Sequence, residues 1–466
     1  MATATYTELL RRNPNFRRLW IGQTISELGS WFSFIAELGL VRLYSGSAMV
    51  TTALLVARLL PFLLVAPLAG VFVDRHSRKR IMIAADLLRS LVALVFIVAA
   101  WLGSAWLVVA SSVLMSSLTM FFEAAKNAAM PNMVTGRELL TANVLMFSTR
   151  FLQFTLGSAM GGLTAAQFGY DVAFIVNSLS FVASALFIAA IPVEAMRKSA
   201  LAREEPDAAA DSAAHESMVL LDPLSADAVE SVPIAGSEQP SDPVRGRFFS
   251  ELRDGLRYAW ATPFVRGVIL VNIGWATGGG MTTILFDRIG AHVFSRGEAD
   301  RGDWVVASLF TAGGAGLFIG MMLARRAGIW VADRRRAGHF IGWSLLAHGV
   351  LFAVGGLMPS LALMSLWVAA SRLVLGMEFG VQETLMMRVL PDQYRGRVFT
   401  TDRSLELSTM AISTIVAGWL LGWFSPRALM VTAGLLSASP GLIWLIALGL
   451  KRFSVPARAV QESYGD

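Results

Sequence analysis

The chain contains the stretch Gly70-Val71-Phe72-Val73-Asp74-Arg75-His76-Ser77-Arg78-Lys79-Arg80, which joins two long apolar segments, residues 47–73 and 81–102. Each segment is long enough to cross a hydrocarbon core of about 30 Å at about 1.5 Å per residue. The two segments therefore predict a helical hairpin in a membrane, with the charged stretch in its turn. Because cytoplasmic loops carry an excess of Lys and Arg, this turn is expected on the cytoplasmic side.

Apolar segments recur along the whole chain of 466 residues, of which 55% are hydrophobic and 15% charged. This composition is too apolar for an ordinary soluble enzyme and predicts an all-α membrane protein. Twelve transmembrane helices are expected, at residues 17–44, 47–73, 81–102, 105–129, 139–166, 170–192, 264–290, 303–326, 338–358, 360–389, 396–423 and 426–450.

Basic residues gather on one side of the predicted bundle, among them Arg17, Arg18, Arg75, Arg78, Lys79, Arg80, Arg334, Arg335, Arg336, Arg395 and Arg397. The other side offers few, namely Arg42, Arg296, Arg301 and Arg427. This bias predicts a multi-pass protein of a bacterial inner membrane, in contact with membrane lipids, with both termini in the cytoplasm. The net charge of +6 is spread over every cytoplasmic turn, so no nucleic acid is expected as a partner.

Residues 193–246 interrupt the apolar pattern. They are rich in Ala, Ser, Asp, Glu and Pro, and this composition predicts a disordered cytoplasmic linker. The linker separates an N-terminal six-helix bundle, residues 1–192, from residues 247–466, where an amphipathic interfacial helix is expected to precede six more helices.

An internal repeat supports two related halves. Glu123, Pro131, Gly136 and Arg137 recur as Glu383, Pro391, Gly396 and Arg397, each offset by 260 residues. Both copies lie where the fourth predicted helix of a half ends and the fifth begins. This placement is expected for two transporter halves that arose by duplication.

These features resemble the major facilitator superfamily, and the resemblance covers nearly the whole chain. The family signature that follows the second helix, G-x3-D-R-x-G-R-K/R-R/K, matches Gly70, Asp74, Arg75, Arg78, Lys79 and Arg80, with Ser77 in place of its second glycine. Residues 15–23 and 121–131 resemble the branch that includes macrolide efflux proteins and the enterobactin exporter. The resemblance implies two pseudo-symmetric six-helix bundles, the major facilitator fold.

The resemblance also implies a conformational latch made of Gly70, Asp74, Arg75, Arg78 and Glu123. In the family, the acid matching Asp74 lies against the N-terminal end of the eleventh helix, and the arginine matching Arg78 pairs with an acid on the fourth helix, here Glu123. A carboxylate beside a helix N-terminus is electrostatically favourable. The alternative is that the basic residues of this turn only set the topology.

Ionisable residues at membrane depth are functional candidates because burying them is costly. Counting about 1.5 Å per residue from each helix end puts several of them near the midplane. They are Glu27, Arg58, Arg150, Arg372 and Glu406, which we assign to a substrate and proton path, and His348, which we interpret as a packing residue. Glu27 and Arg58 are expected to form a buried pair, while Asp287 and Arg288 are expected to snorkel to the membrane surface.

We interpret the chain as a secondary active transporter that exports an amphiphilic, drug-like small molecule in exchange for protons. A partial antiporter signature, Gly157, Gly161 and Gly162, favours export, although Ser158 stands where a proline is expected. The alternatives are a siderophore exporter, a lysophospholipid or other lipid transporter, and a non-transporting membrane sensor or scaffold.

The sequence contains no phosphate-binding or catalytic motif, so we predict neither an enzyme nor a cofactor site. The chain also has no Cys, and no metal site is predicted. A monomer is expected.

Overall fold

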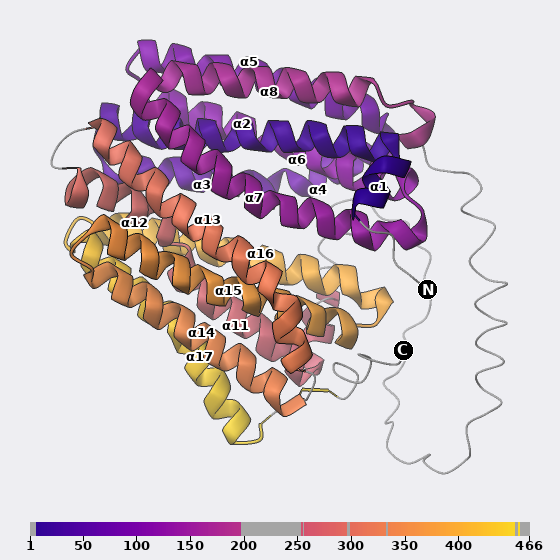
Figure 1. The fold of residues 1–466 in the computed structure, drawn as a ribbon, viewed down its shortest axis with the longest axis vertical. Coiled ribbons are helices and arrows are strands. Elements are labelled where there is room, and N and C mark those ends of the chain that lie inside the picture. Colours follow the sequence, from indigo (N-terminus) through magenta and orange to yellow (C-terminus); the bar gives the residue numbers. More distant parts are fainter. Residues whose placement is uncertain are drawn as a thin grey trace.

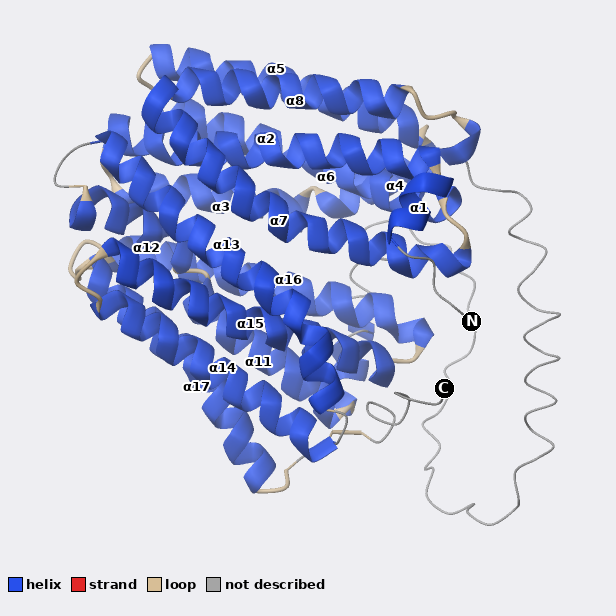
Figure 2. Ribbon diagram, viewed as in Figure 1, coloured by secondary structure: helices blue, strands red, loops and turns tan. Residues whose placement is uncertain are grey.

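The computed structural model of the chain describes residues 6–196, 253–254, 256–295, 299–331, 334–452 and 455–456 (Figure 1). Within these residues every regular element is a helix (Figure 2). The predicted linker, residues 193–246, and the start of the predicted interfacial helix fall mostly outside the described residues. The division into residues 1–192, 193–246 and 247–466 therefore stays a prediction.

The helices of the first half are α1 (Tyr6–Arg12), α2 (Pro14–Ser45), α3 (Ala48–Leu64), α4 (Ala66–Arg75), α5 (Arg78–Trp101), α6 (Ala105–Met133), α7 (Gly136–Phe168), α8 (Tyr170–Ala189) and η1 (Glu194–Met196). Those of the second half are α11 (Pro263–Gly279), α12 (Thr282–Ile289), η3 (Gly290–Phe294), α13 (Ala299–Trp330), α14 (Arg334–Leu357), α15 (Leu361–Val389), α16 (Asp392–Leu420) and α17 (Pro426–Gly449). Their bounds agree with the predicted segments to within a few residues.

Eight of the described spans are long and apolar enough to cross a membrane, or up to nine if α3 and α4 form one bent span. The bend between α3 and α4 is 46° and lies just before Pro67, whose ring and missing N–H interrupt a continuous helix. α2, α7 and α16 have 32, 33 and 29 residues and are as long, but they are more polar than the rest. The prediction of an all-α membrane protein is confirmed, and the count of twelve spans depends on these three polar helices.

The helices form two sets, α2–α8 and α11–α17, which lie above and below one another in Figure 1. Across the boundary α7 packs against α13, and α3 packs against α16 and α12. The two sets lie close together at the end where α2 finishes and diverge toward the end that carries α1 (Figure 1). Arg42 lies in the last turn of α2. We call these the Arg42 end and the α1 end.

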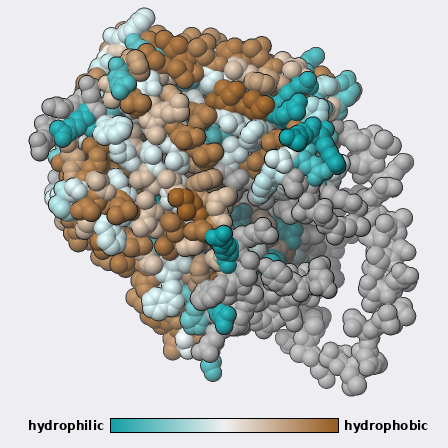
Figure 3. Space-filling model, viewed as in Figure 1, coloured by the Kyte–Doolittle hydropathy of each residue, from teal (hydrophilic) through white to brown (hydrophobic). Residues whose placement is uncertain are grey.

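The surface matches a hydrocarbon environment. Apolar side chains cover much of the helical face in Figure 3, while hydrophilic ones gather mainly toward the α1 end. Leu91, Leu179 and Ile443 are 61%, 62% and 66% exposed. In water so much exposed apolar surface would be unfavourable, whereas lipid chains cover it without cost.

The repeat found in the sequence lies at equivalent junctions. Glu123 and Glu383 lie on α6 and α15, both of 29 residues, and each helix is followed directly by the long polar helix α7 or α16. The two junctions differ in detail, because Pro131 lies inside α6 whereas Pro391 is the N-cap of α16.

A buried ion pair stabilises the first set of helices. Asp86 and Arg89, both on α5, are 0% and 3% exposed and bond to each other. The Arg89 guanidinium carbon also lies 4.4 and 4.5 Å from the ring centres of Phe122 on α6 and Phe181 on α8. One guanidinium therefore connects three helices.

We predict that Asp86→Ala lowers the stability of the first set of helices by about 3–5 kcal/mol, because it leaves the buried Arg89 charge uncompensated. Thermal unfolding in detergent measures the effect. Glu8→Ala is the matched control, because Glu8 pairs with Arg12 on the surface, and it should change stability by about 0.5 kcal/mol or less. The double variant Asp86→Leu/Arg89→Met should regain most of the loss, and a single variant as stable as wild type would contradict the prediction.

Candidate functional site

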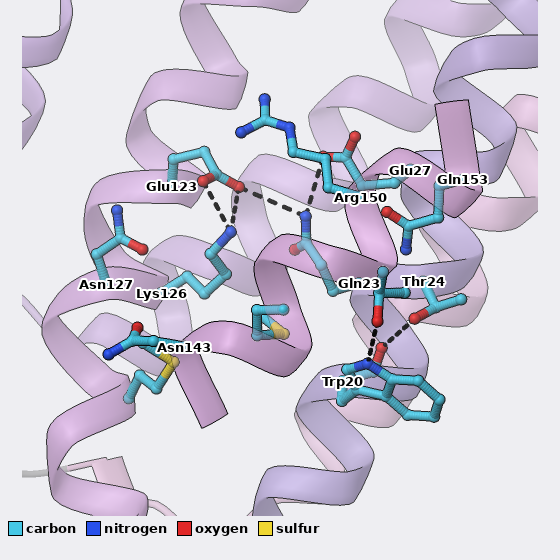
Figure 4. A pocket seen from close by; sticks show the side chains of 13 residues that line it. Trp20, Gln23, Thr24, Glu27, Glu123, Lys126, Asn127, Asn143, Arg150 and Gln153 are labelled. Atoms are coloured by element: carbon cyan, nitrogen blue, oxygen red, sulfur yellow. Dashed lines mark hydrogen bonds and ion pairs between the residues drawn. The ribbon is translucent and has the colours of Figure 1, made fainter. Parts of the chain in front are cut away.

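A polar cavity of about 230 Å³ lies between α2, α6 and α7, in the half of these helices nearer the α1 end (Figure 4). Its walls combine charged, amide, hydroxyl, tryptophan and methionine side chains, contributed by Trp20, Gln23, Thr24, Glu27, Glu123, Lys126, Asn127, Met130, Asn143, Met146, Thr149, Arg150 and Gln153. Polar side chains on these long helices therefore face a cavity.

The cavity brings together three of the predicted site residues: Glu27, Arg150 and Glu123. Gln23 Nε2 donates to Glu27 Oε1 at 2.9 Å and lies 3.5 Å from Glu123 Oε1. Figure 4 shows Arg150 beside these two acids. Within the described residues Arg150 makes no direct ion pair, but its charge lies close enough to act on Glu123.

Glu123 has a different partner from the one that the resemblance implied. Both of its carboxylate oxygens accept from Lys126 Nζ, at 2.6 and 2.7 Å. Arg78 instead donates to the carbonyl of Met196 at 3.3 Å. The expected pair of Arg78 with Glu123 is therefore absent from this conformation, and Lys126 was overlooked in the sequence although it stands three residues after an acid on an apolar helix.

The expected pair between Glu27 and Arg58 is wrong. Arg58 Nη1 bonds Glu37 Oε2 at 2.9 Å, and Ser112 Oγ donates to the same oxygen at 2.8 Å. Glu37 is 1% exposed, whereas its partner Arg58 is 28% exposed, so the acid is buried and the arginine is only partly so. α2 and α3 form a hairpin that turns at Gly46. Residues at similar distances from the turn face each other, and Glu37 is closer to the turn than Glu27. Arg58 therefore meets Glu37.

Two further predicted site residues, Arg372 and Glu406, lie in the second half and outside the polar cavity. Arg372 Nη2 donates to Thr282 Oγ1 at 3.0 Å, and its guanidinium carbon lies 5.4 Å from the Phe352 ring centre. Glu406 pairs with Arg403 on the same helix at 2.8 Å. Among the described residues Arg372 has no acidic partner.

His348 is a packing residue, as predicted. Trp275 Nε1 donates to its Nε2 at 3.2 Å, and its Nδ1 lies 2.8 Å from Ser371 Oγ. The ring is 2% exposed, so both nitrogens are used within α11, α14 and α15.

A buried ion cluster joins the two halves at the Arg42 end. Arg42 on α2 bonds Asp287 Oδ1 at 2.6 Å and also bonds Asp303 on α13. Tyr170 OH donates to Asp303 Oδ2 at 2.7 Å, and Arg288 Nη1 donates to the carbonyl of Gly46 at 2.8 Å. We call Arg42, Tyr170, Asp287, Arg288 and Asp303 the Arg42 cluster.

The Arg42 cluster corrects the expectation that Asp287 and Arg288 snorkel to the surface. Their exposures are 0% and 3%, and that of Asp303 is 1%. Snorkelling was the natural interpretation for charges near a helix end. It fails here because the end of α12 lies against α2 and α3 of the other half, a contact that no local pattern predicts.

Aromatic contacts continue the closure between the halves. Phe310 on α13 lies with its ring centre 5.6 Å from Phe34 and 5.9 Å from Phe154 of the first half. Trp31 packs on Phe154 at 4.5 Å, and Phe286 packs on Phe310 at 5.4 Å. Ring contacts at these distances exclude water from the space between the halves.

The predicted latch at the α1 end is not engaged. Asp74 and Arg75 are exposed, and within the described residues neither forms an ion pair. Gly70 has open space around its α-carbon. Lys79 caps the end of α8 by donating to the carbonyls of Ala189 and Ile191 at 2.7 and 2.6 Å, which is a structural role.

Comparisons with known proteins agree with this fold. A family model described as "Transmembrane secretion effector" matches residues 4–215. Macrolide efflux protein A of Streptococcus pyogenes is 23% identical over 86% of this chain and 88% of its own length. Multidrug efflux pump Tap of Mycolicibacterium fortuitum is 25% identical over 84% of this chain and 85% of its own.

Solved structures show the same architecture. A bacterial homologue of the lysosomal transporter Spinster, in an inward-facing and occupied conformation, has a TM-score of 0.65 at 13% identity, over 93% of this chain and 96% of its own. A bacterial homologue of the iron transporter ferroportin in its inward-facing state has a TM-score of 0.62 at 14% identity, over 92% and 98%. Together these matches support a membrane transporter of the major facilitator type that resembles the macrolide efflux proteins.

We predict that Arg42→Ala shifts the protein toward a conformation that is open at the Arg42 end. The change leaves Asp287 and Asp303 buried without their counter-charge, and a shift of roughly tenfold or more in the conformational equilibrium is expected. Labelling of Ser295→Cys, introduced into this cysteine-free chain, should become faster, while labelling of Thr24→Cys in the cavity should become slower.

Two further variants make this test specific. Arg301→Ala removes an exposed arginine from the same end and should leave both labelling rates unchanged. Asp74→Asn should favour the present conformation or leave it unchanged, because Asp74 has no partner to lose here. Unchanged labelling of Ser295→Cys in Arg42→Ala would mean that the Arg42 cluster does not hold this end closed.

Proposed function

We propose that the chain exports an amphiphilic, drug-like small molecule from the cytoplasm of a bacterium, by alternating access and in exchange for protons. In this proposal the α1 end faces the cytoplasm, in keeping with the basic residues of its helix connections. The observation that carries the proposal is an asymmetry between the two ends. The Arg42 cluster joins the halves at one end, whereas Asp74 has no ion-pair partner among the described residues at the other.

This asymmetry is what one state of an alternating transporter requires. A transporter must open to one side at a time, so each end needs contacts between the halves that form in one state and break in the other. The Arg42 cluster supplies such contacts for the present state. The family signature around Asp74 supplies candidates for the opposite state.

The chemistry of the cavity supports an amphiphilic substrate. Glu27 is partly exposed and has only Gln23 as a hydrogen-bond partner among the described residues, so its carboxylate can accept a bond from a substrate ammonium. Trp20, Met130 and Met146 offer apolar and adaptable surface beside it. The relatives named as macrolide and multidrug efflux proteins favour a substrate of this kind.

One observation favours a second candidate, an anionic amphiphile such as a siderophore or a lysophospholipid. Arg372 makes no ion pair among the described residues, and its guanidinium packs near the Phe352 ring. An arginine of this kind suits a carboxylate or a phosphate. A non-transporting sensor or scaffold has no specific observation in its favour.

Transport by purified protein in proteoliposomes tests the proposal. A macrolide that carries a tertiary amine is expected to accumulate against its gradient when a pH gradient is imposed, and the accumulation should collapse when the gradient is removed. Thermal-shift screening with the macrolide, a siderophore and a lysophospholipid separates the candidates. Stabilisation by the anionic ligands alone would replace the first candidate with the second, and no transport of any of the three would refute the proposal.

We predict that Glu27→Gln weakens binding of the amine-bearing macrolide by about tenfold, because it removes a charge-assisted hydrogen bond of about 1.5–3 kcal/mol. Equilibrium binding to the detergent-purified protein measures the effect. Glu8→Gln makes the same chemical change on the exposed helix α1 and should leave the affinity unchanged. Equal affinities of Glu27→Gln and wild type would place the substrate amine elsewhere.

A further inference from the structure

Glu378 on α15 is a buried acid for which the described residues provide no partner. Its side chain is 1% exposed, and neither carboxylate oxygen accepts a hydrogen bond from any of these residues. Within the described residues it forms no ion pair either. The other buried acids described above, such as Glu37, Asp86 and Asp303, each bond a cation.

Close helix packing keeps water away from Glu378. Gly376 and Gly380 flank it on α15, and α13 packs directly against both, since a Cβ at Gly380 would approach Ala324 Cβ to 2.5 Å. α14 packs on another side of α15. Glu378 lies in the second half of α15. Other ionisable groups on α15 and on the helices beside it include Arg266 on α11, Arg326 on α13, His339 and His348 on α14, and Glu383 on α15. None of them forms an ion pair with Glu378.

A chain of hydrogen bonds leads from the next turn of α15 to a second acid. Gln382 Nε2 donates to Asn272 Oδ1 at 2.9 Å, and Asn272 Nδ2 donates to Asp402 Oδ2 at 2.9 Å. The Asp402 carboxylate can only accept, so the NH2 group of Asn272 must face it and the Asn272 oxygen must face Gln382. The NH2 group of Gln382 then donates to that oxygen, and the Gln382 oxygen points away from it. Gln382 Oε1 is therefore left as a buried acceptor without a donor.

Glu378 and Gln382 are four residues apart, so their side chains are neighbours on one face of α15. This face thus holds three buried acceptor oxygens, two of Glu378 and one of Gln382, and no donor for any of them. Burying an unpaired carboxylate and an unsatisfied amide oxygen together is strongly unfavourable. One proton on Glu378 removes the charge and provides a donor for Gln382.

We propose that Glu378 carries the proton that this transporter exchanges for its substrate. The inference rests on the proposed proton antiport and assigns its coupling residue. In the present state the Glu378 carboxyl group is protonated and shielded from water. Its O–H bond breaks when the proton is released to water at the α1 end, and a new one forms when a proton enters from the opposite side.

In this proposal protons pass between Glu378 and water by way of Asp402, at the far end of the hydrogen-bond chain. Asp402 is partly exposed on α16, and its second carboxylate oxygen, Oδ1, is buried and has no hydrogen-bond partner among the described residues. From the sequence, two other acids, Glu27 and Glu406, are assigned to the substrate and proton path. Glu27 lies at the wall of the polar cavity, and Glu406 is held by Arg403 at 2.8 Å, so neither is shielded and unpaired as Glu378 is.

Infrared spectroscopy of the full-length protein in lipid tests the protonation without any substrate. Wild type should show the C=O stretching band of a protonated carboxyl group near neutral pH, and Glu378→Gln should lose that band. Glu27→Gln should keep it. A band that persists unchanged in Glu378→Gln would overturn the inference.

Transport in proteoliposomes then tests the coupling. With the amine-bearing macrolide as probe, Glu378→Gln should reduce accumulation driven by a pH gradient at least tenfold, while macrolide still binds and stabilises the protein. Glu378→Asp, which restores a carboxyl group, should recover part of the accumulation, and Glu8→Gln should resemble wild type.

The outcomes separate the two proposals. If wild-type accumulation ignores the pH gradient, proton antiport is wrong, and the coupling role of Glu378 falls with it. If wild type responds to the gradient and Glu378→Gln responds equally, only the role of Glu378 is wrong. A Glu378→Gln protein that neither binds macrolide nor unfolds cooperatively would show that Glu378 is structural, which also overturns the inference.

Discussion

The Arg42 guanidinium, bonded to Asp287 and Asp303, is the interaction on which the arrangement of the two halves depends. The two carboxylates belong to the second half and the arginine to the first, and all three lie away from water. Removing either partner would leave a buried charge alone, so these groups favour one relative placement of the halves. The aromatic contacts of Phe310 with Phe34 and Phe154 add apolar packing beside the same junction.

The cost of burying a charge without a counter-charge also divides the other charged residues of the bundle into two groups. Pairs such as Glu37 with Arg58 and Asp86 with Arg89 are complete within one half and stabilise it. Groups such as Arg150 and Glu378 form no direct ion pair among the described residues. Because an unpaired charge is costly in a membrane, a fold that retains such groups does so where a ligand or a proton can complete them. This distinction separates structural residues from functional candidates more sharply than depth in the membrane does.

The two halves use their equivalent helices differently. α6 and α15 have equal lengths and carry Glu123 and Glu383 of the repeat. Around α6 the polar groups line an open cavity with Glu27 and Arg150, whereas on α15 Glu378 and Gln382 are enclosed by neighbouring helices. The structure thus combines an accessible polar cavity in the first half with a shielded acid in the second.

The sequence alone determined the fold class, the helix bounds and the membrane setting, because these follow from local hydrophobicity and length. The sequence also identified Glu27 and Arg150 as candidates for a substrate and proton path, because ionisable residues at membrane depth are costly to bury. Only the tertiary structure decided which charges are paired. Arg58 meets Glu37 because of the hairpin geometry, and Asp287 and Asp303 meet Arg42 across 245 and 261 residues. Glu378 has no partner among the described residues. Ion pairing depends on distances of a few ångströms between helices remote in sequence, and no periodicity along the chain encodes such distances.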